Sequence, residues 1–378
     1  MRFTLVTNII SPHQLPLARQ LVARLGAAQF RYVAITPLSV ERAQLGWVNA
    51  EQPPWLLESW RNEARAHEAE RWIQEADVVL CGNRDLGLFE RRLAERKLLL
   101  YMAERWFLPP IGMGRLLHPR FLRMALRFRR LARSPHFHHL AIGLPAVRDM
   151  RVVCRLPGRS WLWGYFVDPP AAPAERRPRQ ADLRILWAGR MLGWKRVDTL
   201  IRAVAICREQ ESACQLRLIG CGEQETALRQ LARRLGCYDS VTFEPPVPVA
   251  QVREALRQTD VYVLPSNGCE GWGVALNEAM LEGACVVASP ETGSAQTLVR
   301  DGANGLLFRP GDVQGLAQQL LRLARDEPLR QRLAAAGRET ILSAWTPDVA
   351  AERLLAFSEA LIAGRTPPVY TEGPLQRI

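Results

Sequence analysis

Short apolar runs of three to six residues alternate with longer amphipathic stretches along most of this chain. Short runs of this kind are typical of strands buried in parallel sheets, and the amphipathic stretches are typical of helices that cover them. The predicted strands are Arg2–Thr7, Tyr32–Thr36, Val78–Cys81 and Leu98–Met102, followed by Ile185–Ala188, Gln215–Ile219, Val241–Phe243, Tyr262–Leu264 and Cys285–Ala288. The pattern therefore predicts an α/β protein with two Rossmann-like domains, parallel sheets and a site in the cleft between the domains.

Composition places a domain boundary near the middle of the chain. Residues 168–182 are rich in proline, alanine and charge, unlike the segments on either side. With 378 residues, the chain suits two domains of ordinary size. We therefore expect an N-terminal domain over 1–167 and a C-terminal domain over 183–345, joined by the linker 168–182. An amphipathic helix is expected over 346–364, and residues 365–378 are expected to form a loose tail.

The segment 262–289 carries the first chemical signal. Its apolar run ends in a Pro-Ser-Asn-Gly turn, Glu270 precedes a predicted helix, and Glu278 lies in the early turns of that helix. The first N–H groups of a helix are unpaired and the helix dipole is positive there, so this geometry favours an anion. Carboxylates beside an anion site would repel phosphate, so they are expected to meet neutral hydroxyls. Phosphate together with hydroxyls indicates a sugar nucleotide.

A second signal follows the predicted strand Ile185–Ala188. Arg190 comes two residues after that strand, Lys195 comes five residues later, and a helix is expected to begin near Asp198. Both cations can reach a diphosphate held at this loop. Of the 50 basic residues only Lys97 and Lys195 are lysines, so a lysine at this position indicates a need for a compact point charge. The alternative is a solvated surface lysine.

These motifs resemble the C-terminal half of the GT-B glycosyltransferases of the large retaining family 4. That family has an Arg and a Lys after one strand, and an E-x7-E pattern that Glu270 and Glu278 match in register. Two lesser elements also match, the strand-to-glycine loop Leu218–Glu223 and the segment from Gly293 to Leu306. The resemblance covers residues 183–345, and its four elements occur in the family's order.

The resemblance implies a GT-B fold, in which two Rossmann-like domains with parallel sheets face each other across a cleft. It implies transfer with retention of configuration and without a metal, and no D-x-D pair occurs in the sequence. Arg190, Lys195 and the helix N-terminus would stabilise the departing diphosphate. Glu270 would hold hydroxyls of the donor sugar, and Glu278 would hold the ribose or, alternatively, pair with the helix dipole. The helix over 346–364 would cross back to the N-terminal domain.

The resemblance also assigns residues to the nucleotide. The expected catalytic residues are Arg190, Lys195 and Glu270, and the expected nucleotide-binding residues are Glu278, Gly271, Trp272, Gly273, Val274, Gly222 and Glu244. Glu244 begins the loop at which the family contacts the base. The donor is expected to be linked to UDP or GDP, with neither a cofactor nor a metal.

The acceptor side is expected in the N-terminal domain. Ser11 and His13 follow the first predicted strand, where the family has a Gly-Gly loop that this chain lacks. Glu104 and Arg105 follow the strand Leu98–Met102, where relatives often place a His. Either residue could meet the acceptor or the donor sugar, or the two could form a structural ion pair.

Positive charge is concentrated in the first half of the chain. Residues 1–182 hold 28 basic and 16 acidic side chains, whereas residues 183–378 hold 22 of each. The segment Pro119–Arg133 predicts a basic amphipathic helix that could bind an anionic membrane surface. The alternative is a helix that faces the core and exposes a basic back. The expected apolar face is Phe121, Met124, Ala125, Phe128 and Leu131, opposite Arg120, Arg123, Arg127 and Arg130.

Several other features argue against particular functions. No nucleic-acid motif or stacking pattern accompanies the basic residues, so no nucleic-acid partner is expected. The eight cysteines lack metal spacing, and His136–His139 is expected in a surface loop. Neither a signal peptide nor an apolar stretch of about 18 residues occurs, which favours a cytoplasmic protein that is either soluble or peripheral on the inner face of the plasma membrane.

We therefore expect a hexosyltransferase-type enzyme that transfers a sugar from a nucleotide-sugar donor to a glycan or polyprenyl-linked acceptor. Its expected role is bacterial cell-envelope or exopolysaccharide assembly. Two alternatives are a sugar-nucleotide epimerase on the same fold and a non-catalytic GT-B scaffold protein. An epimerase would leave the basic half unexplained, and loss of Arg190, Lys195 or Glu270 would have favoured the scaffold.

Overall fold

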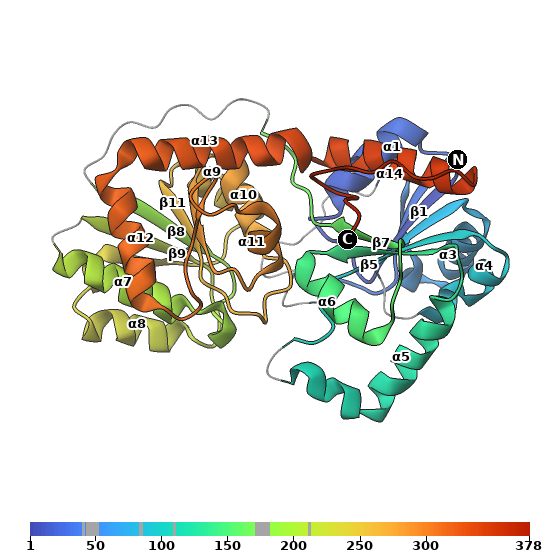
Figure 1. Cartoon of the computed structure of the whole chain (residues 1–378). Helices are drawn as coiled ribbons and strands as arrows, with labels where there is room; N and C mark the ends of the chain where they lie inside the picture. Colours follow the sequence, from blue (N-terminus) through green and yellow to red (C-terminus); the bar gives the residue numbers. More distant parts are fainter. Residues whose placement is uncertain (40–41, 43–52, 83–85, 109–110, 171–181, 211–212) are drawn as a thin grey trace. The chain divides into compact units, whose positions relative to one another are not determined.

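The computed structural model describes residues 1–378 except 40–41, 43–52, 83–85, 109–110, 171–181 and 211–212. Within it the chain divides into two compact units (Figure 1). Unit 1 contains the described residues up to Asp168 together with Ala344–Ile378, and unit 2 contains those of Pro169–Ser343. Each unit is built on one sheet, in which the strands pair in parallel.

The sheet of unit 1 has the strand order β3-β2-β1-β4-β5-β6-β7. Its strands are β1 (Phe3–Thr7), β2 (Phe30–Ala34), β3 (Leu56–Glu58), β4 (Val78–Cys81), β5 (Leu98–Ala103), β6 (Phe137–Ile142) and β7 (Ser160–Trp163). Its helices are α1 (Leu15–Leu25), α3 (Glu63–Glu75), α4 (Glu90–Ala94), α5 (Pro119–Leu131), α6 (Leu144–Val153) and α14 (Pro347–Ile362), with short 3-10 helices η1 (Ser59–Arg61), η2 (Leu86–Phe89) and η3 (Gly112–Leu117). In Figure 1, α14 lies alongside α1, although the two are far apart in the sequence.

The sheet of unit 2 has the strand order β10-β9-β8-β11-β12-β13. Its strands are β8 (Leu183–Ala188), β9 (Cys214–Ile219), β10 (Val241–Glu244), β11 (Val261–Leu264), β12 (Cys285–Ala288) and β13 (Leu306–Leu307). Its helices are α7 (Val197–Glu209), α8 (Glu225–Arg234), α9 (Val249–Arg257), α10 (Ala275–Leu281), α11 (Gly293–Leu298), α12 (Val313–Arg325) and α13 (Glu327–Ala344), with η4 (Gly193–Lys195) and η5 (Tyr238–Ser240). The strand order reverses between β8 and β11, and in open parallel sheets this is the point at which ligands bind.

The α/β class and the strands predicted from the sequence are confirmed, most with ends shifted by one or two residues. The sequence missed β3, β6, β7 and β13. The expectation that His136–His139 forms a surface loop is wrong, because His138 and His139 are buried in β6. Burial lowers the pKa of His138 to about 4 and that of His139 to about 3, so both rings are neutral at physiological pH.

The end of the chain is held against the sheet, so the expectation of a loose tail is wrong. Leu375 is fully buried, and its N–H donates to the Leu162 carbonyl over 2.7 Å. The Leu162 N–H in turn donates to the Gln376 carbonyl over 2.9 Å. Strand β7 lies at the edge of its sheet and would otherwise leave these groups open. The chain end therefore covers an exposed strand edge.

Helix α5 forms where the sequence predicts it, and its predicted apolar face packs on the core. Ala125, Phe128 and Leu131 are buried, and Phe121 and Met124 pack against the same cluster. The core-facing alternative is therefore correct for this face, and the basic back is exposed. No helix in the described ranges is long and apolar enough to cross a membrane.

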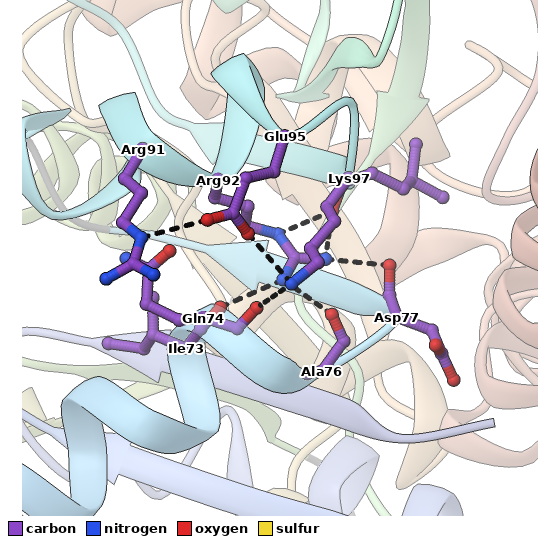
Figure 2. A network of polar contacts seen from close by, with 9 residues as sticks. Ile73, Gln74, Ala76, Asp77, Arg91, Arg92, Glu95 and Lys97 are labelled. Atoms are coloured by element: carbon purple, nitrogen blue, oxygen red, sulfur yellow. Dashed lines mark hydrogen bonds and ion pairs between the residues drawn. The ribbon is translucent and has the colours of Figure 1, made fainter.

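A buried arginine ties α3 and α4 to the sheet of unit 1. Arg92 is fully buried on α4, and Figure 2 shows its guanidinium group among backbone carbonyls. It donates to Ile73 and Ala76 over 2.9 and 2.5 Å, to Asp77 over 2.7 Å, and to Leu98 over 3.0 and 2.9 Å. The last carbonyls of a helix have no partner within it, so Arg92 satisfies groups at the end of α3 that burial would otherwise leave unpaired.

Replacing Arg92 by Met is expected to lower the free energy of unfolding by at least about 3 kcal/mol. The Met side chain keeps the apolar stem but leaves several buried carbonyls without donors. The urea midpoint of the tryptophan fluorescence signal measures the loss. The matched control is Arg91→Met on the same helix, because Arg91 is 76% exposed and a surface pair such as the one with Glu95 contributes little to stability. Equal midpoints for the two variants would contradict this role of Arg92.

Candidate functional site

Two loops of unit 2 meet where the strand order of its sheet reverses. The first loop joins β8 to α7 and contains Arg190 and Lys195, and the second joins β11 to α10 and contains Glu270. The Asn267 N–H donates to the Trp194 carbonyl over 3.0 Å, which ties the second loop to the first. Parallel strands present the loops after their carboxyl ends at one edge of the sheet, so these residues share a common edge.

Lys195 and Glu270 form an ion pair at this edge. The Lys195 ammonium contacts Glu270 Oε2, and the Ser266 hydroxyl donates to the same oxygen over 2.9 Å. The ammonium also lies 4.6 Å from the centre of the Trp194 ring, whose face attracts a cation. The Lys195 side chain is only 16% exposed, so the alternative of a solvated surface lysine is wrong.

Arg190 lies at the start of the same loop and is half-buried. The chain turns after it, where the Leu192 N–H donates to the Arg190 carbonyl over 2.9 Å. The loop after β9 packs against this segment and needs glycine to do so, because a Cβ on Gly222 would lie 2.6 Å from the Met191 carbonyl oxygen. Gly222 therefore allows a close approach of two loops beside Lys195.

The segment between the two predicted carboxylates is tied to α11. The Gly271 carbonyl accepts from Gly293 N–H over 3.0 Å, and the Trp272 carbonyl accepts from Ser294 N–H over 2.9 Å. The Ser294 hydroxyl donates to the Gly273 carbonyl over 3.1 Å. Residue 274, the valine named from the sequence, is the N-cap of α10. Backbone groups thus fix this loop beside Glu270.

The side chain of Trp272 points into the core. It is 1% exposed, and its indole N–H donates to Asn277 Oδ1 over 2.9 Å. The ring therefore supports the loop and the first turn of α10 from inside. The sequence names Trp272 as a nucleotide-binding residue, and the structure buries it in the core.

Glu278 is a buried carboxyl group in α10. Burial raises the pKa of Glu278 to about 7, Arg253 opposes the rise, and Glu282 adds to it. Glu278 also lies in the first turn of α10, where the helix dipole favours a carboxylate, so its roles beside the ribose and beside the dipole both stay predictions. Glu282 itself is fully buried and is held by Arg253 and Arg257 over 2.6 and 2.8 Å.

Tyr262 on β11 is a neighbour of both predicted carboxylates that the sequence did not single out. Its ring is fully buried, and its hydroxyl makes no hydrogen bond within the described part of the chain. The pKa of Tyr262 is raised by burial first and then by the charges of Glu270 and Glu278. Tyr262 looked like an ordinary strand residue in the sequence because nothing local distinguishes its hydroxyl.

Glu244 has its side chain engaged in the sheet. Its carboxylate accepts from Arg217 Nε over 2.7 Å and from Arg217 Nη2 over 2.9 Å, and its carbonyl accepts from Gly220 N–H over 3.0 Å. This bidentate pair joins β10 to β9. The Glu244 carboxylate is therefore already paired within the sheet.

The acceptor-side residues named from the sequence lie in unit 1, where two of them surround one tyrosine. The Tyr165 hydroxyl donates to Glu104 Oε1 over 2.8 Å, and its ring centre lies 6.0 Å from that of His13. Burial, together with Arg42, lowers the pKa of His13 to about 4, so the ring is neutral. The Ser11 hydroxyl accepts from His13 N–H over 3.3 Å. Tyr165 was missed because it follows β7, which the sequence did not predict.

Arg105 points away from this cluster. Its Nε lies 3.6 Å from Asp149 Oδ2, and the same oxygen accepts from Trp106 N–H over 2.7 Å and from Phe107 N–H over 2.8 Å. Arg105 and Asp149 therefore hold the chain after β5 in place. Arg105 thus forms a structural ion pair with Asp149, while Glu104 accepts a hydrogen bond from Tyr165. Among the described residues, no group of three His, Cys, Asp or Glu is arranged to hold a metal ion.

This chain is similar to known glycosyltransferases. Residues 170–340 match the family model described as glycosyl transferases group 1. A D-inositol 3-phosphate glycosyltransferase of Thermomonospora curvata is 38% identical over 199 residues, which are 49% of this chain and 45% of that protein. A phosphatidyl-myo-inositol mannosyltransferase of Mycobacterium leprae is 35% identical over 147 residues, 39% of this chain and 38% of that protein. The chain thus spans less than half the length of these relatives.

A solved structure matches nearly the whole chain. The crystal structure of HepE of Anabaena in complex with UDP aligns with a TM-score of 0.71 and 17% identity, and covers 96% of this chain and 100% of that one. At this identity the likeness defines the fold, which is the GT-B fold predicted from the sequence. The site around Lys195 and Glu270 lies inside the segment 170–340 that matches the group 1 model. The predicted resemblance to these enzymes is confirmed.

The raised pKa of Glu278 makes stability depend on pH. The folded-state pKa of about 7 is above the ordinary value of 4.5, so the stabilisation is complete below about pH 4.5 and is lost as the pH rises through 7. As the pH rises across this window, the free energy of unfolding of Glu278→Gln is expected to increase relative to that of the wild type, by about 3 kcal/mol at most. Thermal unfolding midpoints from pH 4.5 to 8 measure the difference.

The control for this measurement is Glu339→Gln, because Glu339 is exposed on α13. Its difference from the wild type is expected to stay flat with pH. A flat difference for Glu278→Gln as well would show that Glu278 is ionised in the folded protein at neutral pH.

Proposed function

We propose that this chain is a retaining, metal-independent glycosyltransferase. It transfers a sugar from a UDP- or GDP-linked donor to a glycan or polyprenyl-linked acceptor, in cell-envelope or exopolysaccharide assembly. The observation that carries the proposal is the ion pair of Lys195 and Glu270 at the reversal of strand order, inside the segment that matches the group 1 model. A cation and a hydroxyl-binding carboxylate side by side fit the two halves of a sugar nucleotide.

The ion pair prepares the site for a donor of this kind. Without a ligand, Lys195 and Glu270 neutralise each other, so neither charge is buried alone. When the donor binds, its diphosphate takes over the Lys195 ammonium, and sugar hydroxyls donate to Glu270. Ser266 keeps one hydrogen bond to Glu270 during this exchange. The donor thus replaces one balanced set of contacts with another.

The transfer step places negative charge where the cations lie. The bond between the anomeric carbon and the diphosphate oxygen breaks, a bond to the acceptor hydroxyl oxygen forms, and the hydroxyl proton passes to an oxygen of the departing diphosphate. Charge develops on the departing phosphate, where Lys195 and Arg190 stabilise it electrostatically without a metal. A preorganised cation of this type typically contributes about 10²–10³ to the rate.

The nucleotide is assigned to the surroundings of Glu278. A buried carboxyl group with a pKa near 7 ionises readily when ribose hydroxyls donate to it. Gly222 and the segment of Gly271, Gly273 and Val274 supply closely packed backbone around the diphosphate. HepE, which shares the fold, was crystallised with UDP, and this supports a nucleotide diphosphate at the corresponding place.

The acceptor is assigned to the polar cluster in unit 1. His13 is neutral, and Glu104 already accepts from the Tyr165 hydroxyl, so the cluster offers groups suited to sugar hydroxyls. Two similar proteins are named for transfer to inositol 3-phosphate and to phosphatidyl-myo-inositol. These names support a hydroxylated, lipid-linked or phosphorylated acceptor.

Replacing Lys195 by Met is expected to reduce kcat/KM for transfer about 10²–10³-fold, with the same loss in the presence of EDTA. The ammonium is lost where charge develops, whereas the stem still packs on Trp194. Turnover with UDP- and GDP-sugars and a hydroxylated acceptor measures the loss, and the proton coupling at the anomeric carbon of the product reports retention.

The matched control is Lys97→Met, which removes the only other lysine and lies in unit 1 near Gln74 and Glu95. It is expected to keep transfer per folded molecule. Activity of Lys195→Met within a few-fold of the control would refute the assignment of the site. Absence of turnover in every protein, with nucleotide binding intact, would favour the scaffold alternative.

A further inference from the structure

Half of the large hydrophobic side chains that are exposed in the described residues lie within one short segment, from Ile111 to Leu126. They belong to η3 and to the outward side of α5. These side chains are Ile111, Met113, Leu117, Leu122 and Leu126. The other five exposed large hydrophobic side chains are scattered over both units. Leu117 is 86% exposed and Leu126 is 60% exposed. An exposed apolar cluster of this kind marks an interaction surface more often than single exposed residues do.

This surface is held in place by the protein. Leu116, between two exposed members of the cluster, packs against the core of unit 1. Arg115 donates to the Trp106 carbonyl over 2.9 Å, and the His118 ring accepts from Arg120 N–H over 3.3 Å at the start of α5. Figure 1 shows α5 at the margin of unit 1, away from the strands labelled β1, β5 and β7. The apolar side chains therefore stand on a fixed, outlying element.

The same segment carries strong positive charge. Residues 105–133 contain eight arginines and no acidic residue. Arg120, Arg123 and Arg133 are exposed and make no ion pair within the described part of the chain. Arg127 and Arg130 share the single carboxylate of Glu90, at 2.7 and 3.0 Å. The surface therefore keeps an excess of cations directly beside its leucines.

The geometry of α5 separates this apolar surface from the one that packs on the core. Leu122 and Leu126 are four residues apart and lie along one line of the helix, whereas Ala125 and Phe128 point into the core. A hollow of about 500 Å³ lined by Glu90, Leu126, Arg127 and Arg130 opens beside this line. Helix α5 thus uses one apolar face for folding and leaves a second, smaller one open.

We propose that Ile111, Met113, Leu117, Leu122 and Leu126, with the neighbouring arginines, form a surface that inserts into an anionic phospholipid bilayer. Apolar side chains of this size gain free energy in the acyl boundary, while arginines bind lipid phosphates and keep their charged ends at the headgroup level. This surface differs from the apolar face of α5 named from the sequence, because that face packs on the core. The proposed contact also does not span the bilayer. It is a shallow contact through the outward side of η3 and α5.

Two other occupants fit the surface less well. A second copy of the chain would bring the same arginines together across a two-fold interface, and like charges would repel. A nucleic acid would use the arginines but has no use for exposed leucines, and the surface offers no exposed aromatic ring for base stacking. A bilayer uses both the leucines and the arginines.

The experiment is flotation of the full chain with vesicles, without any nucleotide. One set of vesicles is phosphatidylcholine alone, and the other is phosphatidylcholine mixed with phosphatidylglycerol. The wild type is expected to float with the anionic vesicles only, and less so as salt is raised. The double variant Leu117→Asn, Leu126→Asn is expected to partition at least about tenfold less. Arg120→Gln with Arg123→Gln is expected to partition into these vesicles about twenty-five-fold less, because each arginine contributes a factor of about five.

Matched controls lie elsewhere on the protein. Val369→Asn changes an apolar side chain that is 62% exposed, and Arg234→Gln changes an exposed arginine on α8. Both are expected to float like the wild type. All variants replace exposed side chains, and equal unfolding midpoints show that each is folded.

Three results would overturn the proposal. One is failure of the wild type to float with anionic vesicles at physiological salt. Another is equal flotation of the leucine variant and the controls. The third is a dimer, or binding to a single-stranded RNA probe, that depends on these residues while vesicles are not bound. The assay needs no donor, so its failure leaves the proposed transfer reaction untouched, and loss of Lys195 leaves flotation unchanged.

Discussion

The contact between Lys195 and Glu270 is the constraint on which the rest of the donor site depends. Two opposite charges in a largely buried place stabilise the protein only when their geometry is fixed. Strands β8 and β11 bring their loops to one edge, and the bond from Asn267 to Trp194 holds the loops together. Gly222 permits the close packing behind them. The sheet topology therefore places a cation and a carboxylate side by side before any ligand arrives.

Unit 2 was largely predictable from the sequence because its chemistry lies near apolar strands that the hydrophobic pattern reveals. Glu270 and Lys195 follow such a strand by six and seven residues, and Glu278 precedes one by seven residues. The cluster in unit 1 was only partly predictable. Tyr165 and Glu104 come from segments that are distant in sequence, and a pattern of neighbouring residues carries no information on their contact. Local periodicity predicts elements, whereas contacts between elements depend on the whole fold.

Polar and proline-rich segments explain the remaining errors. His138 and His139 look like surface residues in the sequence, but burial keeps both rings neutral inside β6. The last residues of the chain look like a tail because of their prolines, yet Leu375 pairs with the open edge of β7. Helix α5 was predicted correctly, but its amphipathic pattern did not reveal that a second apolar line, through Leu122 and Leu126, stays exposed.

The most direct test of the account is calorimetric titration of the chain with UDP, GDP and their sugar conjugates in EDTA. The account predicts that one diphosphate family binds without metal, and that Lys195→Met weakens this binding at least about tenfold, since an ion pair with phosphate is lost. Glu270→Gln is expected to weaken binding of the sugar conjugate more than binding of the free diphosphate. Binding that requires a divalent metal, or that is equal in the wild type and Lys195→Met, would contradict the central claim.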